Sequence, residues 1–182
     1  HNTSSITDYT PIMLKEFSFS TNWFWFEDTQ KGLYGIMDNQ GNLVIEPLFE
    51  QVESFIEGIA IVKKEGFYGA INQEGKLVIP YLYEELHSSK EQRIAFKEYG
   101  LWGFFDPEGN KIVPAIYEEV EDFSEGLALV SLNYFFGYID FQGKIVIPIA
   151  FDRAESFNSG TAEVEYKGLL FYINKRGQRI RD

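Results

Sequence analysis

Acidic side chains recur at a fixed place along the chain and are the first candidates for chemistry. They form one series of equivalent positions: Glu50, Glu84, Glu118 and Asp152. Carboxylates stacked in a column repel one another, and Ca²⁺, which prefers oxygen ligands, would relieve that repulsion. However, the sequence contains no dense Asp-x-Asp-x-Asp loop, and isolated acids on polar loops are usually only solvated. We therefore predict no metal site and no cofactor, and keep these four acids as second-choice Ca²⁺ candidates.

Two tryptophans and one irregular loop are the candidates for binding. Trp23 and Trp25 lie two residues apart, so their rings point to the same face of a short strand. Exposed rings would form a binding patch, whereas rings beneath a cap or in a closed ring of sheets would serve packing, which we favour. The loop Ser88–Arg93 lacks the aromatic residue and the glycine found at equivalent places, and we expect it to be looser or specialised. The candidate binding residues are Trp23, Trp25, His87, Ser88, Lys90 and Arg93.

Known catalytic motifs are absent from the sequence. There is no Gly-x-x-x-x-Gly-Lys-Ser/Thr or Gly-x-Gly-x-x-Gly loop for a nucleotide. Cysteine is absent and the histidines are His1 and His87, which excludes thiol nucleophiles, thiolate zinc sites and histidine-rich metal sites. Neither histidine lies in the context of a nucleophile elbow. We expect no enzymatic activity, although the 28 acids leave a carboxylate pair for glycoside hydrolysis open.

The composition restricts the partners and the fold class. A net charge of −12 would repel nucleic acid and anionic membrane surfaces. The longest wholly apolar run, Ile145–Phe151, contains Pro148 and is far shorter than the roughly 20 residues of a spanning helix. We therefore expect no nucleic-acid partner and no membrane insertion. An aromatic content of 17% together with 16 glycines favours β structure over helices.

A 34-residue repeat organises the chain. An aromatic residue followed by glycine recurs at this interval, and a second glycine with the same period lies six residues after the first. Asp or Asn precedes the second glycine, and β-branched pairs and proline follow it. The period matches helical tetratricopeptide arrays as well, but the glycines, prolines and β-branched pairs leave no room for a helix pair. The equivalent positions are Tyr34-Gly35, Tyr68-Gly69, Trp102-Gly103 and Phe136-Gly137, then Gly41, Gly75, Gly109, Gly143 and Gly177.

The sequence of each repeat predicts three β-strands. The segments Asp38–Gly41 and Asp106–Gly109 are typical of hairpin turns in which glycine supplies a positive φ after a type I turn. The second strand ends at proline, which cannot donate to a β-ladder. A connection follows, with one turn of α- or 3₁₀-helix expected at Tyr117–Val120. The third strand contains the alternating residues Ala128–Val130.

The period also predicts the domain organisation. Residues 1–31 form an N-terminal segment with a half unit, whose strand lies near residues 22–26, and residues 32–182 hold the repeats, all within one domain. The fold class is all-β, with tandem three-stranded antiparallel units in a propeller-like or closed array. The alternative is an open solenoid-like array in which the half units are caps. The repeats are 32–65, 66–99, 100–133, 134–167 and the half unit 168–182.

The repeated motifs resemble those of the bacterial WG-repeat family. The aromatic-Gly start, the Asp-x-x-Gly turn, the Ile-Val-Ile-Pro run and the Phe-Ser-Glu-Gly-Leu-Ala-x-Val ending carry the resemblance over residues 32–182. It implies a propeller-like or related β-repeat module that acts in interaction or sensing, without catalysis and with another protein or peptide as partner. The alternative is a carbohydrate-binding or carbohydrate-active protein with a glycan partner. Together with the missing initial methionine, the resemblance leans towards an exported or surface-associated bacterial protein.

Overall fold

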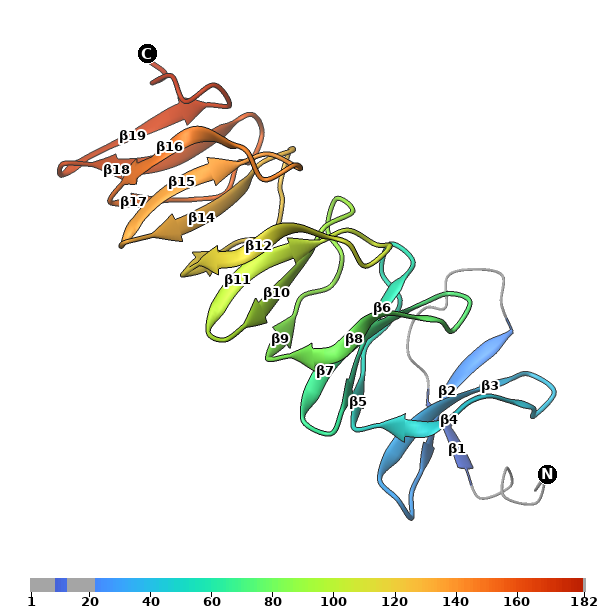
Figure 1. Ribbon diagram of the computed structural model, residues 1–182. Coiled ribbons are helices and arrows are strands. Elements are labelled where there is room, and N and C mark those ends of the chain that lie inside the picture. Colours follow the sequence, from blue (N-terminus) through green and yellow to red (C-terminus); the bar gives the residue numbers. More distant parts are fainter. Residues whose placement is uncertain (1–8, 13–21, 182) are drawn as a thin grey trace. The chain divides into compact units, whose positions relative to one another are not determined.

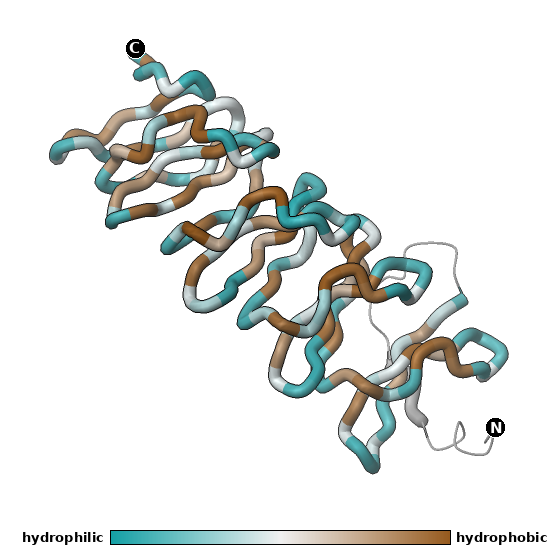
Figure 2. The backbone as a smooth tube through the Cα atoms, in the orientation of Figure 1, coloured by the Kyte–Doolittle hydropathy of each residue, from teal (hydrophilic) through white to brown (hydrophobic). Residues whose placement is uncertain are grey.

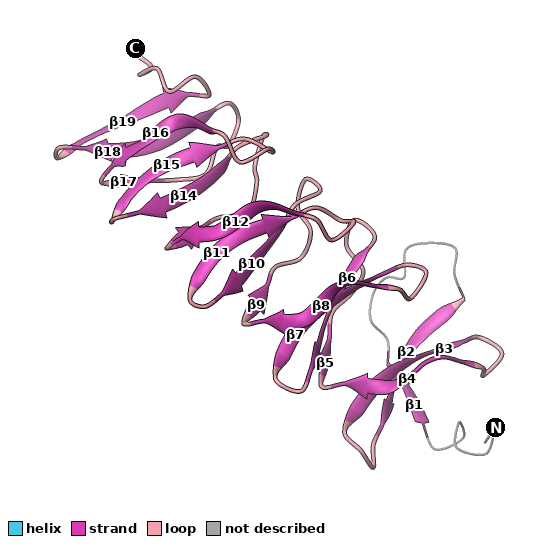
Figure 3. Cartoon of the chain, in the orientation of Figure 1, coloured by secondary structure: helices cyan, strands magenta, loops and turns pink. Residues whose placement is uncertain are grey.

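The computed structural model describes residues 9–12 and 22–181. His1 and most of the segment 1–31 therefore lie outside the described residues. The chain divides into two compact units, His1–Ser88 and Ser89–Asp182, which are described separately. The boundary falls in the repeat where Ser89 replaces the phenylalanine of the other repeats. All regular elements in the described ranges are β-strands, as Figure 3 shows, so no helix among them could cross a membrane.

Two antiparallel sheets form the first unit (Figure 1). In each sheet the strands follow one another in chain order. The first sheet contains β1 (Tyr9–Ile12), β2 (Trp23–Asp28), β3 (Leu33–Asp38) and β4 (Leu43–Phe49). The second contains β5 (Gln51–Val52), β6 (Ile59–Lys64), β7 (Phe67–Asn72) and β8 (Leu77–Tyr83), and β9 (Glu85–Leu86) ends the unit.

The second unit repeats this arrangement. Its sheets are again antiparallel with strands in chain order. The strands are β10 (Ile94–Glu98), β11 (Leu101–Phe105) and β12 (Lys111–Tyr117), then β13 (Glu119–Val120), β14 (Ala128–Leu132), β15 (Phe135–Ile139) and β16 (Ile145–Phe151), then β17 (Arg153–Ala154), β18 (Thr161–Tyr166) and β19 (Leu169–Asn174).

The tandem all-β arrangement predicted from the repeat is confirmed, with two differences in detail. First, the helical turn expected at Tyr117–Val120 is wrong, because β12 ends at Tyr117 and the two-residue strand β13 follows. This short strand pairs with β14 and makes a sheet of four strands instead of three. Secondly, each sheet combines the third strand of one repeat with the first two strands of the next repeat. The sequence did not predict β13, because a segment of two residues has too little periodicity to be recognised as a strand.

The hydrophobic cores lie between neighbouring sheets, and the strand β14 contributes side chains to two of these cores. In the second unit Ala128 and Val130 pack with Phe104 and Phe123 on one face of β14. Leu129 packs on the other face with Tyr138 and Phe157, together with Leu127 just before the strand. Successive side chains of a strand point to opposite faces, so a strand covered on both sides buries every residue. Hydrophilic residues, in contrast, gather at many of the turns that join the strands (Figure 2).

A buried tyrosine, Tyr138, joins two of these sheets through its hydroxyl group. The Tyr138 hydroxyl donates a hydrogen bond of 2.6 Å to the backbone oxygen of Glu155. Burial and the charge of Glu155 raise the pKa of this phenol far above its ordinary value. Tyr138 therefore remains a neutral donor that joins the second and third sheets of the unit.

Candidate functional site

Trp25 lies in the core of the first unit, with 1% of its surface exposed. Its ring stacks on Phe55 at a centroid distance of 6.1 Å and meets Phe49 edge-on at 6.3 Å. Trp23 is half-buried beside the next turn, where a Cβ added to Gly75 would lie 3.5 Å from the indole. A ring without exposed surface cannot contact a partner. The packing alternative therefore describes Trp25, and its place in a binding patch is not retained.

The irregular loop keeps the turn geometry of the regular repeats. Lys90 and Arg93 exchange two backbone hydrogen bonds of 2.9 and 3.1 Å across Glu91 and Gln92. Both central residues have positive φ values, 53° and 62°, as in a type I′ turn. Equivalent positive-φ pairs occur at 57–58, 125–126 and 159–160. The left-handed turn therefore forms here as in the other repeats, although Gln92 replaces the usual glycine.

The remaining loop candidates are engaged with neighbouring side chains or lie at the surface. Arg93 donates from Nε to the backbone oxygen of Phe141 at 3.0 Å, and its guanidinium lies 5.4 Å from the centre of the Phe141 ring. Ser88 donates to a carboxylate oxygen of Glu53 at 3.4 Å. Partial burial raises the pKa of Glu53, while this hydrogen bond and the charge of His87 oppose the rise. His87 is half-buried and Lys90 is exposed. These contacts hold turns in place.

A series of carboxylates links successive turns, and we call Glu91 and Glu125 the carboxylate ladder. Glu91 accepts backbone hydrogen bonds of 2.8 and 2.9 Å from Glu125 and Gly126. Glu125 accepts the equivalent bonds from Ser159 and Gly160. The two N–H groups of each left-handed turn converge on one carboxylate, as in anion-binding nests. Thus the acid that occupies one turn stabilises the next turn along the chain.

The acids considered for Ca²⁺ have a structural use as well. Three of them accept a backbone hydrogen bond from a hairpin turn. Glu50 accepts from Gly66 at 3.3 Å, Glu118 from Tyr134 at 3.3 Å and Asp152 from Lys167 at 2.8 Å. Within residues 9–12 and 22–181 no three histidine, cysteine or acidic side chains gather in a group that could hold a metal ion. Three of the four acids in the column therefore stabilise a hairpin turn.

The glycine after each repeated aromatic residue marks a bulge. Phe136 lies opposite Phe151 and Tyr138 opposite Ile147, so β16 has two extra residues in between. They bring Ile149 so close that a Cβ on Gly137 would lie 2.6 Å from its Cα. A position in contact with another backbone admits only glycine. The preceding aromatic residues are half-buried at the margins of the cores: Tyr34, Tyr68, Trp102 and Phe136.

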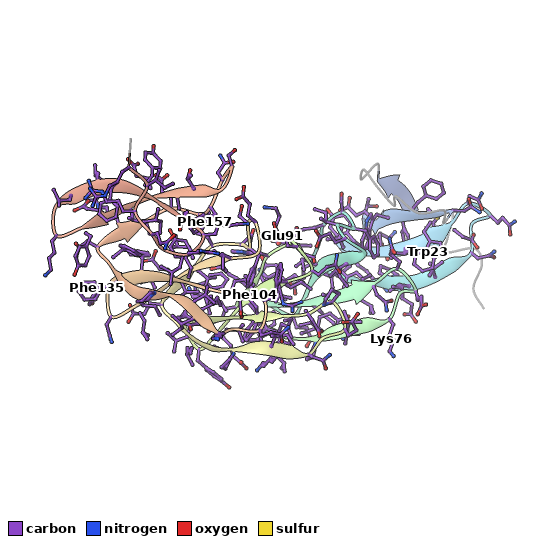
Figure 4. All side chains as sticks on the ribbon, turned by 90° about the horizontal axis from the view of Figure 1, so that it is seen from above. Trp23, Lys76, Glu91, Phe104, Phe135 and Phe157 are labelled. Atoms are coloured by element: carbon purple, nitrogen blue, oxygen red, sulfur yellow. The ribbon has the colours of Figure 1, made fainter. Side chains whose placement is uncertain are left out.

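The second unit exposes aromatic and aliphatic side chains at one end of its strands. We call this surface the hairpin edge: Tyr99, Tyr134, Phe135, Tyr166, Lys167 and Leu169. The turns β10–β11, β14–β15 and β18–β19 carry these residues and lie on the same side of the unit (Figure 1). Figure 4 labels Phe135 at the margin of the unit, whereas Phe104 lies among the side chains of the interior. Large exposed apolar groups of this kind are typical of interaction surfaces.

Tyr99 and Tyr134 are the most exposed of these rings, each with 88% of its surface accessible. Both occupy left-handed backbone positions, with φ values of 53° and 69°. Tyr134 stands where the other hairpins have Gly66, Gly100 and Gly168, which favour this conformation. The sequence did not single out this pair, although tyrosine replaces a repeated glycine at position 134.

A cavity of about 480 Å³, here called the edge cavity, opens between the last two hairpins. Its lining comes from the second and third sheets of the unit and combines rings, aliphatic groups and one charge of each sign. The lining residues are Phe135, Ile149, Ala150, Asp152, Tyr166 and Lys167. None of the residues chosen from the sequence for binding lines it, although Asp152 was among the Ca²⁺ candidates.

Together these features define a tandem β-sheet repeat protein with a hydrophobic edge. The model of the WG containing repeat family matches residues 34–66, 68–102, 102–134 and 136–169, which is well over half of the chain. The chain belongs to the WG-repeat family. No match was found among curated protein sequences.

Two solved structures are similar to the chain at low sequence identity. A eukaryotic initiation factor aligns over 90% of this chain and 52% of its own length, at 11% identity and a TM-score of 0.54. Hsv2 of Kluyveromyces lactis aligns over 68% of this chain and 46% of its own, at 15% identity and a TM-score of 0.43. The chain thus spans about half the length of these proteins. The likeness to the initiation factor concerns the fold alone.

Proposed function

We propose that this chain is a non-catalytic binding module that takes a segment of another protein on the hairpin edge. The observation that carries the proposal is the pair Tyr99 and Tyr134, whose rings are almost fully exposed at strained turn positions. Family membership supports a binding or scaffold role in general terms. The edge supplies the surface through which such a role would be exercised.

The backbone cost of the two tyrosines supports a functional use. A left-handed conformation costs a non-glycine residue about 1 kcal/mol or more, and glycine would avoid this cost at Tyr134. The ring recovers nothing by burial, since most of its surface is exposed to water. A residue that is strained and gains no packing is better explained by a contact outside the chain. Tyrosine is also among the residues enriched at binding hot spots.

Acidic side chains support the turns of the hairpin edge. Glu118 accepts the backbone hydrogen bond of Tyr134, and Asp152 that of Lys167 in the next turn. Glu98 pairs with Lys111 at 2.9 Å near the first turn. Rigid presentation of aromatic side chains lowers the entropy lost on binding. The hairpins therefore act as fixed supports for the exposed rings.

Selection from a phage-displayed library of random dodecapeptides tests the proposal. The immobilised chain is expected to enrich peptides, and a variant with Tyr99→Asn and Tyr134→Gly is expected to lose their binding at least tenfold. Asparagine and glycine tolerate the left-handed backbone, so this variant keeps the fold. The change at Tyr134 raises the free energy of unfolding by about 0.5 kcal/mol.

A matched control separates the edge from exposed tyrosines in general. Tyr172 is half exposed on β19 and lies outside the hairpin edge, so Tyr172→Thr should leave peptide binding unchanged. Failure to enrich any peptide, or equal binding by the edge variant, would overturn the proposal. A calorimetric response to a glycan panel that disappears with Tyr99→Asn and Tyr134→Gly would instead establish a carbohydrate module. The glycan panel is included because exposed aromatic rings can also stack on sugars.

A further inference from the structure

We propose that the edge cavity is an anchor pocket for one apolar side chain of the partner segment, adjacent in sequence to an aspartate or glutamate that pairs with Lys167. The inference rests on the proposed function and names the chemistry of the bound segment. Its evidence is the space in the cavity, the nature of its walls and the charge at its rim.

One small residue contributes to this space. The position of Ala150 carries a large aliphatic side chain in the three preceding repeats: Leu48, Leu82 and Ile116. Alanine at this place leaves room beside Phe135 and Tyr166 that a leucine would occupy. The resulting volume of about 480 Å³ lies within the range of small-ligand pockets. It is ample for the side chain of phenylalanine or leucine.

The walls favour an apolar or aromatic group. Phe135 and Tyr166 line the cavity and are 44% and 39% exposed, so their rings offer surface to a ligand. Tyr166 is held edge-on against Phe151 at a centroid distance of 6.3 Å. Ile149 and Ala150 add aliphatic surface. An entering ring can therefore make aromatic contacts in addition to burying its own apolar area.

The rim selects a carboxylate. The Lys167 ammonium lies 5.4 Å from the centre of the Tyr166 ring and has no ion-pair partner among the residues that the structure describes. Asp152 also lines the cavity, but one of its oxygens already accepts the backbone N–H of Lys167 at 2.8 Å. Lys167 is therefore the cation that remains available at the cavity in a chain of net charge −12. A neighbouring carboxylate on the ligand would complement it.

Blocked tetrapeptides and amide NMR of the labelled chain test the pocket directly. Ac-Gly-Phe-Glu-Gly-NH₂ is expected to shift the amide resonances of Tyr166 and Lys167 and to saturate at millimolar concentration. Ac-Gly-Phe-Lys-Gly-NH₂ should bind about two- to fivefold more weakly, as expected for loss of an exposed ion pair. Ac-Gly-Gly-Glu-Gly-NH₂, which lacks the anchor, should give no saturable shift.

Two variants assign the effect to the cavity. Ala150→Leu, which restores the residue type of the other repeats, should weaken the phenylalanine-glutamate peptide at least tenfold. Lys167→Gln is an exposed substitution that keeps the fold and should abolish the difference between the Glu and Lys peptides. Lys144→Gln removes the same charge in the turn at the other end of β16 and should change neither property.

The outcomes separate this inference from the proposed function. If phage peptides still require Tyr99 and Tyr134 while the tetrapeptides leave Tyr166 and Lys167 unshifted, the anchor pocket is refuted and the binding module stands. Unchanged affinity of Ala150→Leu, or equal binding of the Glu and Lys peptides to the wild-type chain, also refutes it. If no phage peptide is enriched but the tetrapeptides give saturable shifts at the cavity, the role proposed for Tyr99 and Tyr134 is refuted and the anchor pocket stands.

Discussion

Removal of Glu125 tests whether the carboxylate ladder stabilises the second unit. In Glu125→Ala the backbone N–H groups of Ser159 and Gly160 lose their shared acceptor. A hydrogen bond to a charged group contributes about 1.5–3 kcal/mol when shielded from water. The turn is exposed, so water replaces much of each bond. We therefore expect a loss of about 1–2 kcal/mol for the pair of bonds, well below the sum of two shielded ones.

Urea unfolding followed by fluorescence measures this loss, with the slope against urea serving as a check that the unfolding reaction is unchanged. Glu125→Gln keeps one acceptor oxygen and should lose about half as much. Hydrogen exchange of the Gly160 amide should accelerate about five- to thirtyfold in Glu125→Ala, the equivalent of 1–2 kcal/mol. Glu108→Ala is the control, because its side chain makes none of these bonds and it should stay within about 0.5 kcal/mol of wild type. Equal stability of Glu125→Ala and Glu108→Ala would refute the role of the ladder.

Two further predictions concern the turns and bulges of the repeat. Gly137→Ala should lower the free energy of unfolding by about 2–3 kcal/mol, because its Cβ meets the Ile149 backbone. Gly168→Ala has open space around it and should lose only about 1 kcal/mol, through backbone strain. Similar losses of stability for the two variants in thermal unfolding would contradict the bulge argument. Partial burial raises the pKa of Asp106, but hydrogen bonds within its turn outweigh this and leave the pKa lowered. The ionised group therefore stabilises the fold above its unfolded pKa of about 3.9, and this contribution is lost as the pH falls through the lower pKa of the folded state. The advantage of wild type over Asp106→Asn should therefore shrink as the pH falls from about 6 to about 3; a constant difference in stability over that range would show that the charge is not involved.

The sequence was sufficient to predict the features that every repeat shares. Asp106 hydrogen-bonds to the backbone of Glu108 and Asn110 in its turn, and Gly109 has a φ of 90° after it, as the Asp-x-x-Gly spacing implied. Such local geometry is specified by a few neighbouring residues. Repetition of the same pattern then removes the ambiguity that one short segment would have.

The candidate site was harder to predict because it depends on exposure and on distant neighbours. Trp25 stands out by residue type but is buried, whereas Tyr134 looks ordinary and is exposed. The left-handed φ of Gln92 showed that a missing glycine need not change a turn. The sequence did contain two signals, each a departure from the residue found in the other repeats. Tyr134 stands where the others have glycine, and Ala150 stands where they have leucine or isoleucine. Their meaning emerged only when the sheets placed them at one edge.

Because alternate residues of β14 belong to two different cores, neighbouring sheets of the second unit are thermodynamically coupled. Ala128 and Val130 face one sheet, and Leu127 and Leu129 face the next, so damage on either side destabilises the same strand. The array then behaves as a chain of nearest-neighbour interactions, in which unfolding spreads from sheet to sheet. It also means that duplication of a whole 34-residue segment brings a sheet whose two faces already fit its neighbours. Such a chain can lengthen by recombination without designing a new core.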